Sequence, residues 1–163
     1  MWNRLGAASF AFAFAMAIGV SLPDTLLAAA SPPGGGIVKV KSLYGFDETI
    51  SRIKADIAKK GIMFFSSIDQ AQLAADAGIK LRPSTLLIFG NPPLGIQFLT
   101  SNQEAGLDWP VRLLVTEDAQ GQVWAVYSDF AWIARRHHIK NRDAAFKMAS
   151  QVIESITSSV TSK

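Results

Sequence analysis

The sequence contains no cysteine among its 163 residues. This absence excludes a disulfide framework, thiolate chemistry and an anchor attached through a lipid-modified cysteine. Histidine is nearly as scarce, since His137 and His138 are the only two and are adjacent. Neighbouring side chains on a helix point about 100° apart, whereas two histidines that share a metal ion need a spacing of four residues. We therefore predict neither a metal site nor a bound cofactor.

Signatures of hydrolytic enzymes are also missing. There is no G-x-S-x-G motif, and no S-x-x-K motif in the context of a penicillin-binding protein. Glu117 and Asp118 are adjacent at the end of an expected strand, where neighbouring side chains face opposite ways, so they make a poor acid–base pair. No RNA-recognition, helix-turn-helix or zinc-finger pattern is present, which argues against nucleic acid as a partner. The sequence favours a protein without catalytic activity.

The first thirty residues have the pattern of a secretory signal peptide. One cation, Arg4, precedes an uncharged run from Leu5 to Leu22, and an A-x-A pattern ends at Ala30. We expect cleavage after Ala30 and a periplasmic or secreted protein. An uncleaved membrane anchor is the alternative, although the run of 18 residues is at the short limit for a bilayer span. Residues 31–36, SPPGGG, are expected to be a flexible leader to a single domain, residues 37–160.

Alternating and helical spacings of apolar residues predict that this domain has an α+β fold. Strands are expected at residues 37–43, 62–68 and 84–89, with a hairpin between 111 and 128. The lysines of the first strand suit a sheet edge, and the run STLLIF suits a central strand. Helices are expected at 46–61, 69–78, 94–106, 129–139 and 141–160, the N-caps being Asp47, Asp69, Asp129 and Asn141. We predict a two-layer sandwich of about five strands, with helices mainly on one face.

Three segments of the chain resemble one bacterial family. They are GFDETISRIKADIAKKG, LRPSTLLIFGNP and LLVTEDAQGQVWAVYSD with the ARRH that follows, and they extend from about Leu43 to His138. This pattern resembles the family catalogued as domain of unknown function 302, whose members are often exported. The resemblance implies a compact α+β domain that associates as a dimer, and it implies no reaction. Gln70 stands where the family often has a histidine, and Gly95-Ile96 stand where it often has Gly-Thr.

The Asn91-Pro92-Pro93 junction is the first candidate site. N–H groups at the start of a helix can bind an anion, and Gly95 would allow a ligand to approach closely. Asn91, Gly95 and Ile96 are therefore candidate ligand-binding residues. Because the prolines lack N–H groups, the favoured interpretation is simpler: a buried strand ends here and a helix begins.

His137 is the other candidate ligand-binding residue. It is expected on the same helix face as Phe130, Ile133 and Ala134, which favours a histidine at the edge of the core. Arg82, at the far end of the STLLIF strand, is expected to pair with the carboxylate of Glu117 or Asp118.

A cationic segment lies near the end of the domain. Arg135, Arg136, Lys140 and Arg142 form a predicted basic patch around Trp132, suited to anionic headgroups, polyanions or an acidic partner. The simpler interpretation is a solvated helix end, where cations face the helix dipole favourably.

These observations predict an exported, non-catalytic module that forms a homodimer and binds a small apolar ligand or a protein partner. An enzyme with a small site near Asn91-Pro92 is one alternative. Binding to an envelope surface through the basic patch is another, with membrane contact that is peripheral at most.

Overall fold

The computed structural model describes residues 35–162, so the predicted signal peptide and residues 31–34 of the leader lie outside the described residues. Its centre is a five-stranded antiparallel sheet of order β1-β5-β4-β3-β2. The strands are β1 Ile37–Lys41, β2 Met63–Asp69, β3 Ser84–Gly90, β4 Val111–Glu117 and β5 Val123–Ser128. β1 is an edge strand, as its lysines predicted. β3 is an interior strand, between β4 and β2.

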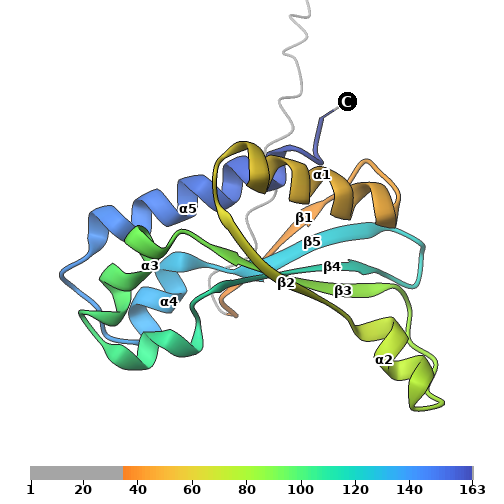
Figure 1. Ribbon diagram of the computed structural model, residues 1–163, viewed down its shortest axis with the longest axis horizontal. Helices are drawn as coiled ribbons and strands as arrows, with labels where there is room; N and C mark the ends of the chain where they lie inside the picture. The colour runs from red at the N-terminus through yellow and green to blue at the C-terminus, as the bar shows by residue number, and fades with distance from the viewer. Residues whose placement is uncertain (1–34, 163) are drawn as a thin grey trace, which may run out of the picture.

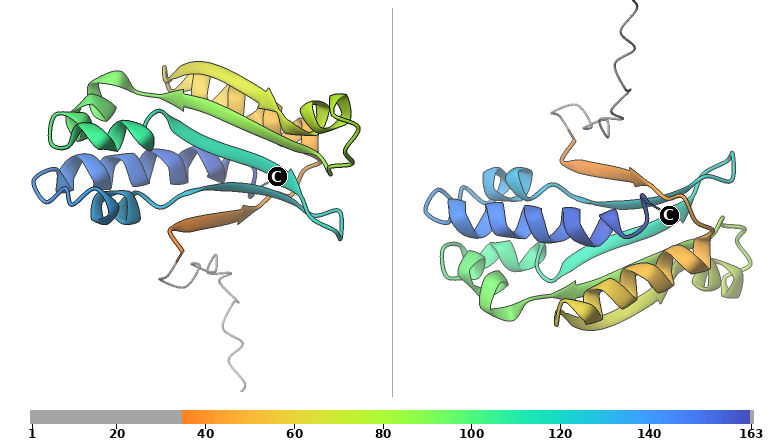
Figure 2. Two further views of the ribbon diagram at one scale, coloured as in Figure 1. Left: turned by 90° about the horizontal axis from the view of Figure 1, so that it is seen from below. Right: turned by 90° about the horizontal axis from the view of Figure 1, so that it is seen from above.

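The helices form the second layer and extend past both ends of the sheet (Figure 1). They are α1 Phe46–Lys59, α2 Gln70–Asp76, α3 Pro92–Leu99, α4 Phe130–Arg136 and α5 Asp143–Ser158, with the 3-10 helix η1 Gln103–Leu107. α1 and α5 cover one face of the sheet, α3, α4 and η1 gather at one end, and α2 projects from the opposite end (Figures 1 and 2). The predicted two-layer α+β sandwich is confirmed.

Hydrogen bonds to side chains confirm two of the four predicted N-caps. Asp69 accepts a hydrogen bond from the N–H of Gln72 at 2.9 Å and starts α2. Asp129 accepts from the first-turn N–H groups of α4. Both are local patterns, in which a carboxylate satisfies N–H groups two or three residues further along the chain.

Three helix predictions are wrong in detail. α1 starts at Phe46 as expected, but its N-cap is Gly45 in place of Asp47, which lies in the first turn, where the helix dipole still favours an anion. α5 is capped by Arg142 in place of Asn141, whose side chain instead accepts a hydrogen bond from Ser101. The single helix predicted at 94–106 is two helices, because the Asn102 side chain accepts from the N–H of Glu104 and starts η1.

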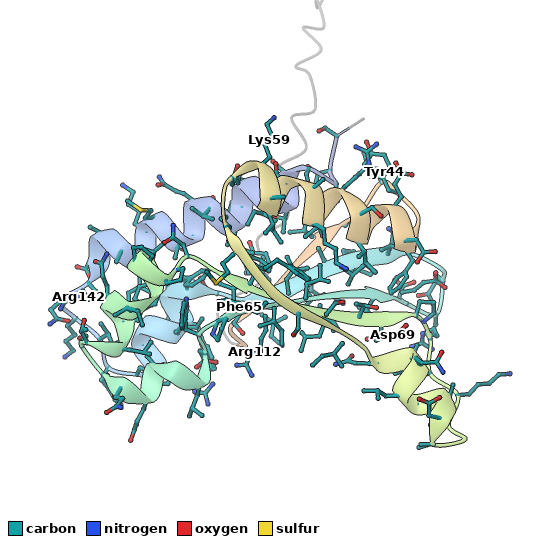
Figure 3. The ribbon with its side chains drawn as sticks, viewed as in Figure 1. Tyr44, Lys59, Phe65, Asp69, Arg112 and Arg142 are labelled. Carbon is teal, nitrogen blue, oxygen red and sulfur yellow. The ribbon has the colours of Figure 1, made fainter. Side chains whose placement is uncertain are left out.

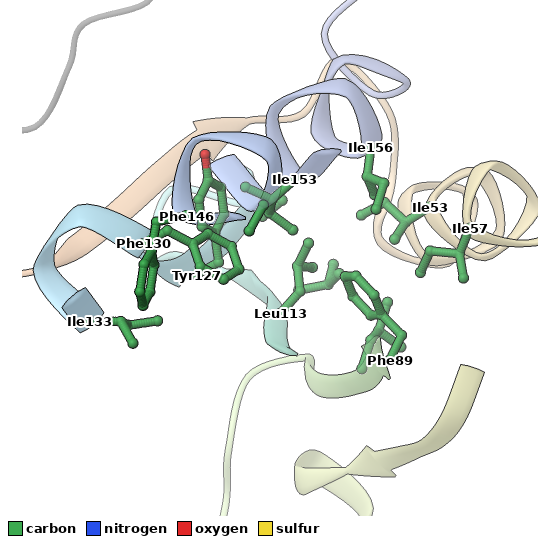
Figure 4. Packing of buried hydrophobic residues seen from close by; sticks show 14 of the residues in the cluster. Ile53, Ile57, Phe89, Leu113, Tyr127, Phe130, Ile133, Phe146, Ile153 and Ile156 are labelled. Atoms are coloured by element: carbon green, nitrogen blue, oxygen red, sulfur yellow. The ribbon is translucent and has the colours of Figure 1, made fainter. Parts of the chain in front are cut away.

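The core fills the space between the sheet and the two long helices (Figure 4). Strand register places Leu87 of β3 opposite Leu113 of β4, and both are fully buried on the face that α1 and α5 cover. Further fully or almost fully buried side chains come from α1, β3 and α5, namely Ile53, Ile57, Phe89, Ile153 and Ile156. Burial of these large apolar side chains is the main source of stability in a chain without disulfides.

The opposite face of the sheet is not covered by α1 or α5 (Figure 2, left). Across this face, register aligns Val126, Leu114, Leu86 and Ile68 as successive cross-strand neighbours on β5, β4, β3 and β2. We call this face the uncovered face. Its apolar row becomes more exposed toward the β2 edge, where Ile68 is 38% exposed.

Candidate functional site

The strand-to-helix junction at Asn91 is closed by its own hydrogen bonds. The backbone oxygen of Asn91 accepts from the N–H groups of Leu94 at 3.1 Å and Gly95 at 2.8 Å. Its side-chain oxygen, the N-cap of α3, accepts from Leu94 at 3.3 Å. Pro92 and Pro93 have no N–H group to offer. The donors that an anion would need at this junction are therefore missing or already engaged.

Trp109 occupies the space in front of Gly95. A Cβ atom added to Gly95 would lie 1.9 Å from Nε1 of Trp109, and one added to Gly90 would lie 3.1 Å from the same atom. The two glycines, at the end of β3 and within α3, therefore make room for the indole. The space at Gly95 that was predicted for a ligand is therefore filled by the side chain of Trp109. The next candidate residue, Ile96, is exposed.

A small apolar pocket lies beside Trp109. It is lined mainly by apolar side chains, among them Phe89, Leu94, Phe98, Phe130 and Ile153. Its cavity volume is about 30 Å³, which suits a single water-sized group. Asn91 is one of its lining residues and also borders a second, open groove of about 340 Å³, which is lined by residues that follow α1 and by residues of α5. A small organic ligand would need Trp109 or its neighbours to move.

The packing of Trp109 on Gly95 gives a testable expectation. Gly95→Ala will lower the free energy of unfolding by about 1–3 kcal/mol, because the added methyl group overlaps the indole. This overlap outweighs the better helix propensity of alanine, which is worth about 1 kcal/mol. In a Trp109→Ala background the same change will be neutral or stabilising. Urea denaturation of the four proteins measures this coupling, and an equal cost of Gly95→Ala in both backgrounds would contradict it.

A polar cluster of four side chains lies next to this pocket, and we call it the Asp108 cluster: Asp108, Arg112, Arg136 and His137. The Asp108 side chain is only 3% exposed. Its carboxylate oxygens lie 2.6 Å from Nε2 of His137, 3.0 Å from a guanidinium nitrogen of Arg112 and 3.0 Å from one of Arg136. Three elements thus meet at one carboxylate: the end of η1, the start of β4 and the end of α4.

His137 is buried at the edge of the core, as predicted, on the helix face that also buries Phe130 and Ile133. Its backbone oxygen accepts a hydrogen bond from the side chain of Asn102 at 2.9 Å, which ties the end of α4 to the start of η1. Sequence reasoning missed its partner Asp108, because that aspartate lies 29 residues away and belongs to no motif.

Three of the four residues of the predicted basic patch contact different partners. Arg136 binds Asp108, while Arg142 donates to the backbone oxygens of Gln97 and Asn141. Arg135 lies 3.9 Å from the carboxylate of Asp129, and Lys140 is exposed. Figure 3 shows Arg142 at the end of the molecule where α5 begins, away from Arg112 below the sheet. Half of the predicted patch is engaged in internal hydrogen bonds.

Two polar residues at the other end of the sheet have structural roles. Arg82 donates to the backbone oxygen of Glu117 at 3.2 Å, so the prediction of a carboxylate partner is wrong, although the neighbour is the expected one. Asp118 forms the expected turn, accepting from the N–H groups of Gln120 and Gln122 at 2.9 Å. The hydrogen bond from the indole of Trp124, followed by that from Gln122, lowers the pKa of Asp118 below its usual value.

Among residues 35–162, no group of three or more histidine and carboxylate side chains could hold a metal ion together. None of the helices described is both long enough and apolar enough to cross a membrane. The fold places this protein in the class of small α+β sandwich domains. In this one, the Asp108 cluster joins a loop to the end of a helix.

This chain belongs to the family described as domain of unknown function DUF302, whose family model matches residues 38–157. In a solved structure of the family, the uncharacterized conserved protein DUF302 from Bacillus stearothermophilus, the same fold recurs with a TM-score of 0.71. The similarity covers 78% of this chain and 99% of that one at 15% sequence identity, so it shows the fold alone.

Curated relatives are more similar in sequence but longer. Proteins named "Fluoride-specific ion channel FluC 1" from Brucella suis biovar 1 (strain 1330) and Brucella abortus biovar 1 (strain 9-941) are each 39% identical over 119 residues. The match covers 72% of this chain, and 47% and 44% of those two proteins. The chain therefore spans about half the length of the curated relatives it matches.

Proposed function

We propose that this protein is an exported, non-catalytic binding module that works as a homodimer. We further propose that residues 63–81, the β2–α2 surface, form the contact between its two copies. The observation that carries the proposal is the exposure of apolar side chains. Seven of the twelve exposed large hydrophobic residues in the described range 35–162 fall within residues 63–81. They are 38% to 63% exposed, namely Met63, Phe64, Phe65, Ile68, Leu73, Ile79 and Leu81.

The secondary structure of this surface supports a contact between strands. All seven residues of β2 are exposed, and α2 has no buried residue. β2 is an edge strand, so the backbone groups along its outer side can pair with another strand. Two copies related by a two-fold axis would bring β2 against β2 in antiparallel order, which is a self-complementary contact. Figure 3 shows Phe65 and Asp69 along this outer strand.

Charge and surface continuity support the same contact. Residues 63–81 contain only three charged residues, Asp69, Asp76 and Lys80, so two copies meet without strong repulsion. Ile68 also continues the apolar row of the uncovered face, so pairing at β2 would extend a shared apolar surface into the second copy. Exposed apolar side chains that are concentrated in one segment are typical of a site of protein association.

Sedimentation of the purified protein tests the proposal. We expect a dimer at micromolar concentration and at least a roughly tenfold weaker association for Leu73→Glu, because a carboxylate would be buried in the contact. Met148→Glu is the matched control, since Met148 is exposed on α5 and lies outside the β2–α2 surface. A monomeric wild-type protein, or a dimer as tight in Leu73→Glu as in the control, would contradict the proposal.

A protein contact is favoured over a small apolar ligand because the apolar pocket beside Trp109 has a volume of only about 30 Å³. The larger groove beside Asn91, of about 340 Å³, is lined in part by the polar side chains of Lys60, Gln151 and Ser155. The export of the module is supported by the signal-peptide pattern of residues 1–30. The curated relatives suggest a second candidate role, in which a domain of this kind works beside a membrane channel. The observation that favours it is that the matching segment fills about half of proteins named as fluoride channels.

A further inference from the structure

We propose that Arg112 and Arg136 together bind an oxyanion, and that Asp108 is the buried positioning residue that holds their guanidinium groups in place. The ligand would be a phosphate group, either free or in a lipid headgroup. This site is independent of the β2–α2 surface.

The first step of the argument is the position of the two guanidinium groups. Oδ1 of Asp108 accepts from a terminal nitrogen of Arg112 at 3.0 Å and from one of Arg136 at 3.2 Å. Two nitrogens bonded to one oxygen atom must lie close together. The Arg112 nitrogen also donates to the backbone oxygen of Leu107 at 2.7 Å, which fixes its orientation further.

The second step is the balance of charge. Two guanidinium groups share one carboxylate, so the cluster carries excess positive charge before any contribution from the imidazole of His137. Asp108 is 3% exposed, whereas the side chains of Arg112 and Arg136 are 49% and 43% exposed. The negative charge is therefore inside and the excess positive charge is at the surface, where an anion in solution can reach it.

The third step is the supply of hydrogen-bond donors. Each arginine uses one terminal nitrogen for Asp108, and within residues 35–162 its Nε and its other terminal nitrogen have no acceptor. A guanidinium edge of two N–H groups matches two oxygens of a phosphate. The Trp132 ring, 5.3 Å from the central carbon of Arg136, restricts that side chain. Groups that are already held in place lose less conformational entropy when they bind a ligand.

Calorimetric titration of the purified protein with inorganic phosphate tests the site. We expect saturable binding that becomes about tenfold weaker in Arg112→Gln and in Arg136→Gln, because each change removes one guanidinium edge. Each variant leaves Asp108 with His137 and the other arginine, so the carboxylate keeps partners. Arg52→Gln is the matched control, since Arg52 is 41% exposed and pairs with Glu48 elsewhere on the surface.

A second probe distinguishes the source of the phosphate group. Vesicles containing phosphatidylglycerol are compared with neutral phosphatidylcholine vesicles by co-sedimentation. Binding of anionic vesicles that is lost in both arginine variants, without binding of free phosphate, assigns the site to a lipid headgroup. Failure of both probes overturns the proposal, as does a loss in Arg52→Gln equal to that in the two arginine variants. Thermal unfolding of each variant verifies that it remains folded.

Discussion

Asp108→Ala will lower the free energy of unfolding by about 3 kcal/mol. The change removes a carboxylate that is hydrogen-bonded to three side chains, which come from β4 and from the end of α4. His137 suffers most, because its ring is buried and would lose the only hydrogen bond that Nε2 makes within residues 35–162. The two arginines are partly exposed and recover water, which keeps the loss below that of a fully buried ion pair.

Urea denaturation measures this loss, and Glu48→Ala provides the scale. Glu48 pairs with Arg52 on the surface of α1 at 2.9 Å, and such a pair contributes at most about 1 kcal/mol. Asp108→Asn should fall between the two, since the amide keeps an acceptor oxygen but loses the charge. If Asp108→Ala cost no more than Glu48→Ala, the cluster would contribute nothing beyond an ordinary surface pair.

Local features of the fold could be predicted because the residues that cause them are neighbours in the chain. Asp69 and Gln72 form a cap over three residues, and Asp118 forms its turn with Gln120 and Gln122. The lysines of β1 predicted an edge strand because charged side chains are tolerated there. Alternation of valines with lysines located β1, and short apolar runs bounded by turn residues located the other four strands.

The candidate site could not be predicted in the same way, since its contacts join distant segments. Gly95 looked like a place for a ligand, yet its lack of a side chain makes room for Trp109, fourteen residues further on. Arg136 looked like part of a solvated patch, yet its partner Asp108 precedes a different element. The sequence alone does not distinguish a glycine at a ligand site from one that makes room for a side chain, or a solvated arginine from one in an internal ion pair. Only the packing of the elements decides between these roles.

The exposure of β2 shows a similar limit. IMFFSSI reads as a strand, which it is, but its apolar residues alone do not say whether it lies inside the sheet or at the edge. A strand apolar on both faces is normally buried. Here every residue of β2 is exposed, and this disagreement between sequence and burial supports the contact between copies that we propose.

Leu87→Ala and Leu86→Ala, adjacent changes on β3, will differ strongly. Leu87 is fully buried against Leu113 beneath α1 and α5, so its truncation will cost about 2–5 kcal/mol. Leu86 is half-buried on the uncovered face, and in a monomer its truncation will cost no more than about half as much. Urea denaturation measures both costs, provided that the slope of the unfolding free energy against urea concentration is the same in the variants as in the wild-type protein.

The same pair of variants also reports on the proposed dimer. Leu86 pairs across strands with Ile68 of β2, so a second copy that covers β2 would bury more of this row. Association stabilises the folded state more at higher protein concentration. If Leu86→Ala weakens the contact, the variant gains less of this stabilisation than the wild-type protein, so its cost should rise with protein concentration. Leu87→Ala should have the same cost at every concentration, since its surroundings lie wholly within one chain. A cost of Leu86→Ala that does not change with protein concentration would show that the uncovered face stays outside the contact between copies.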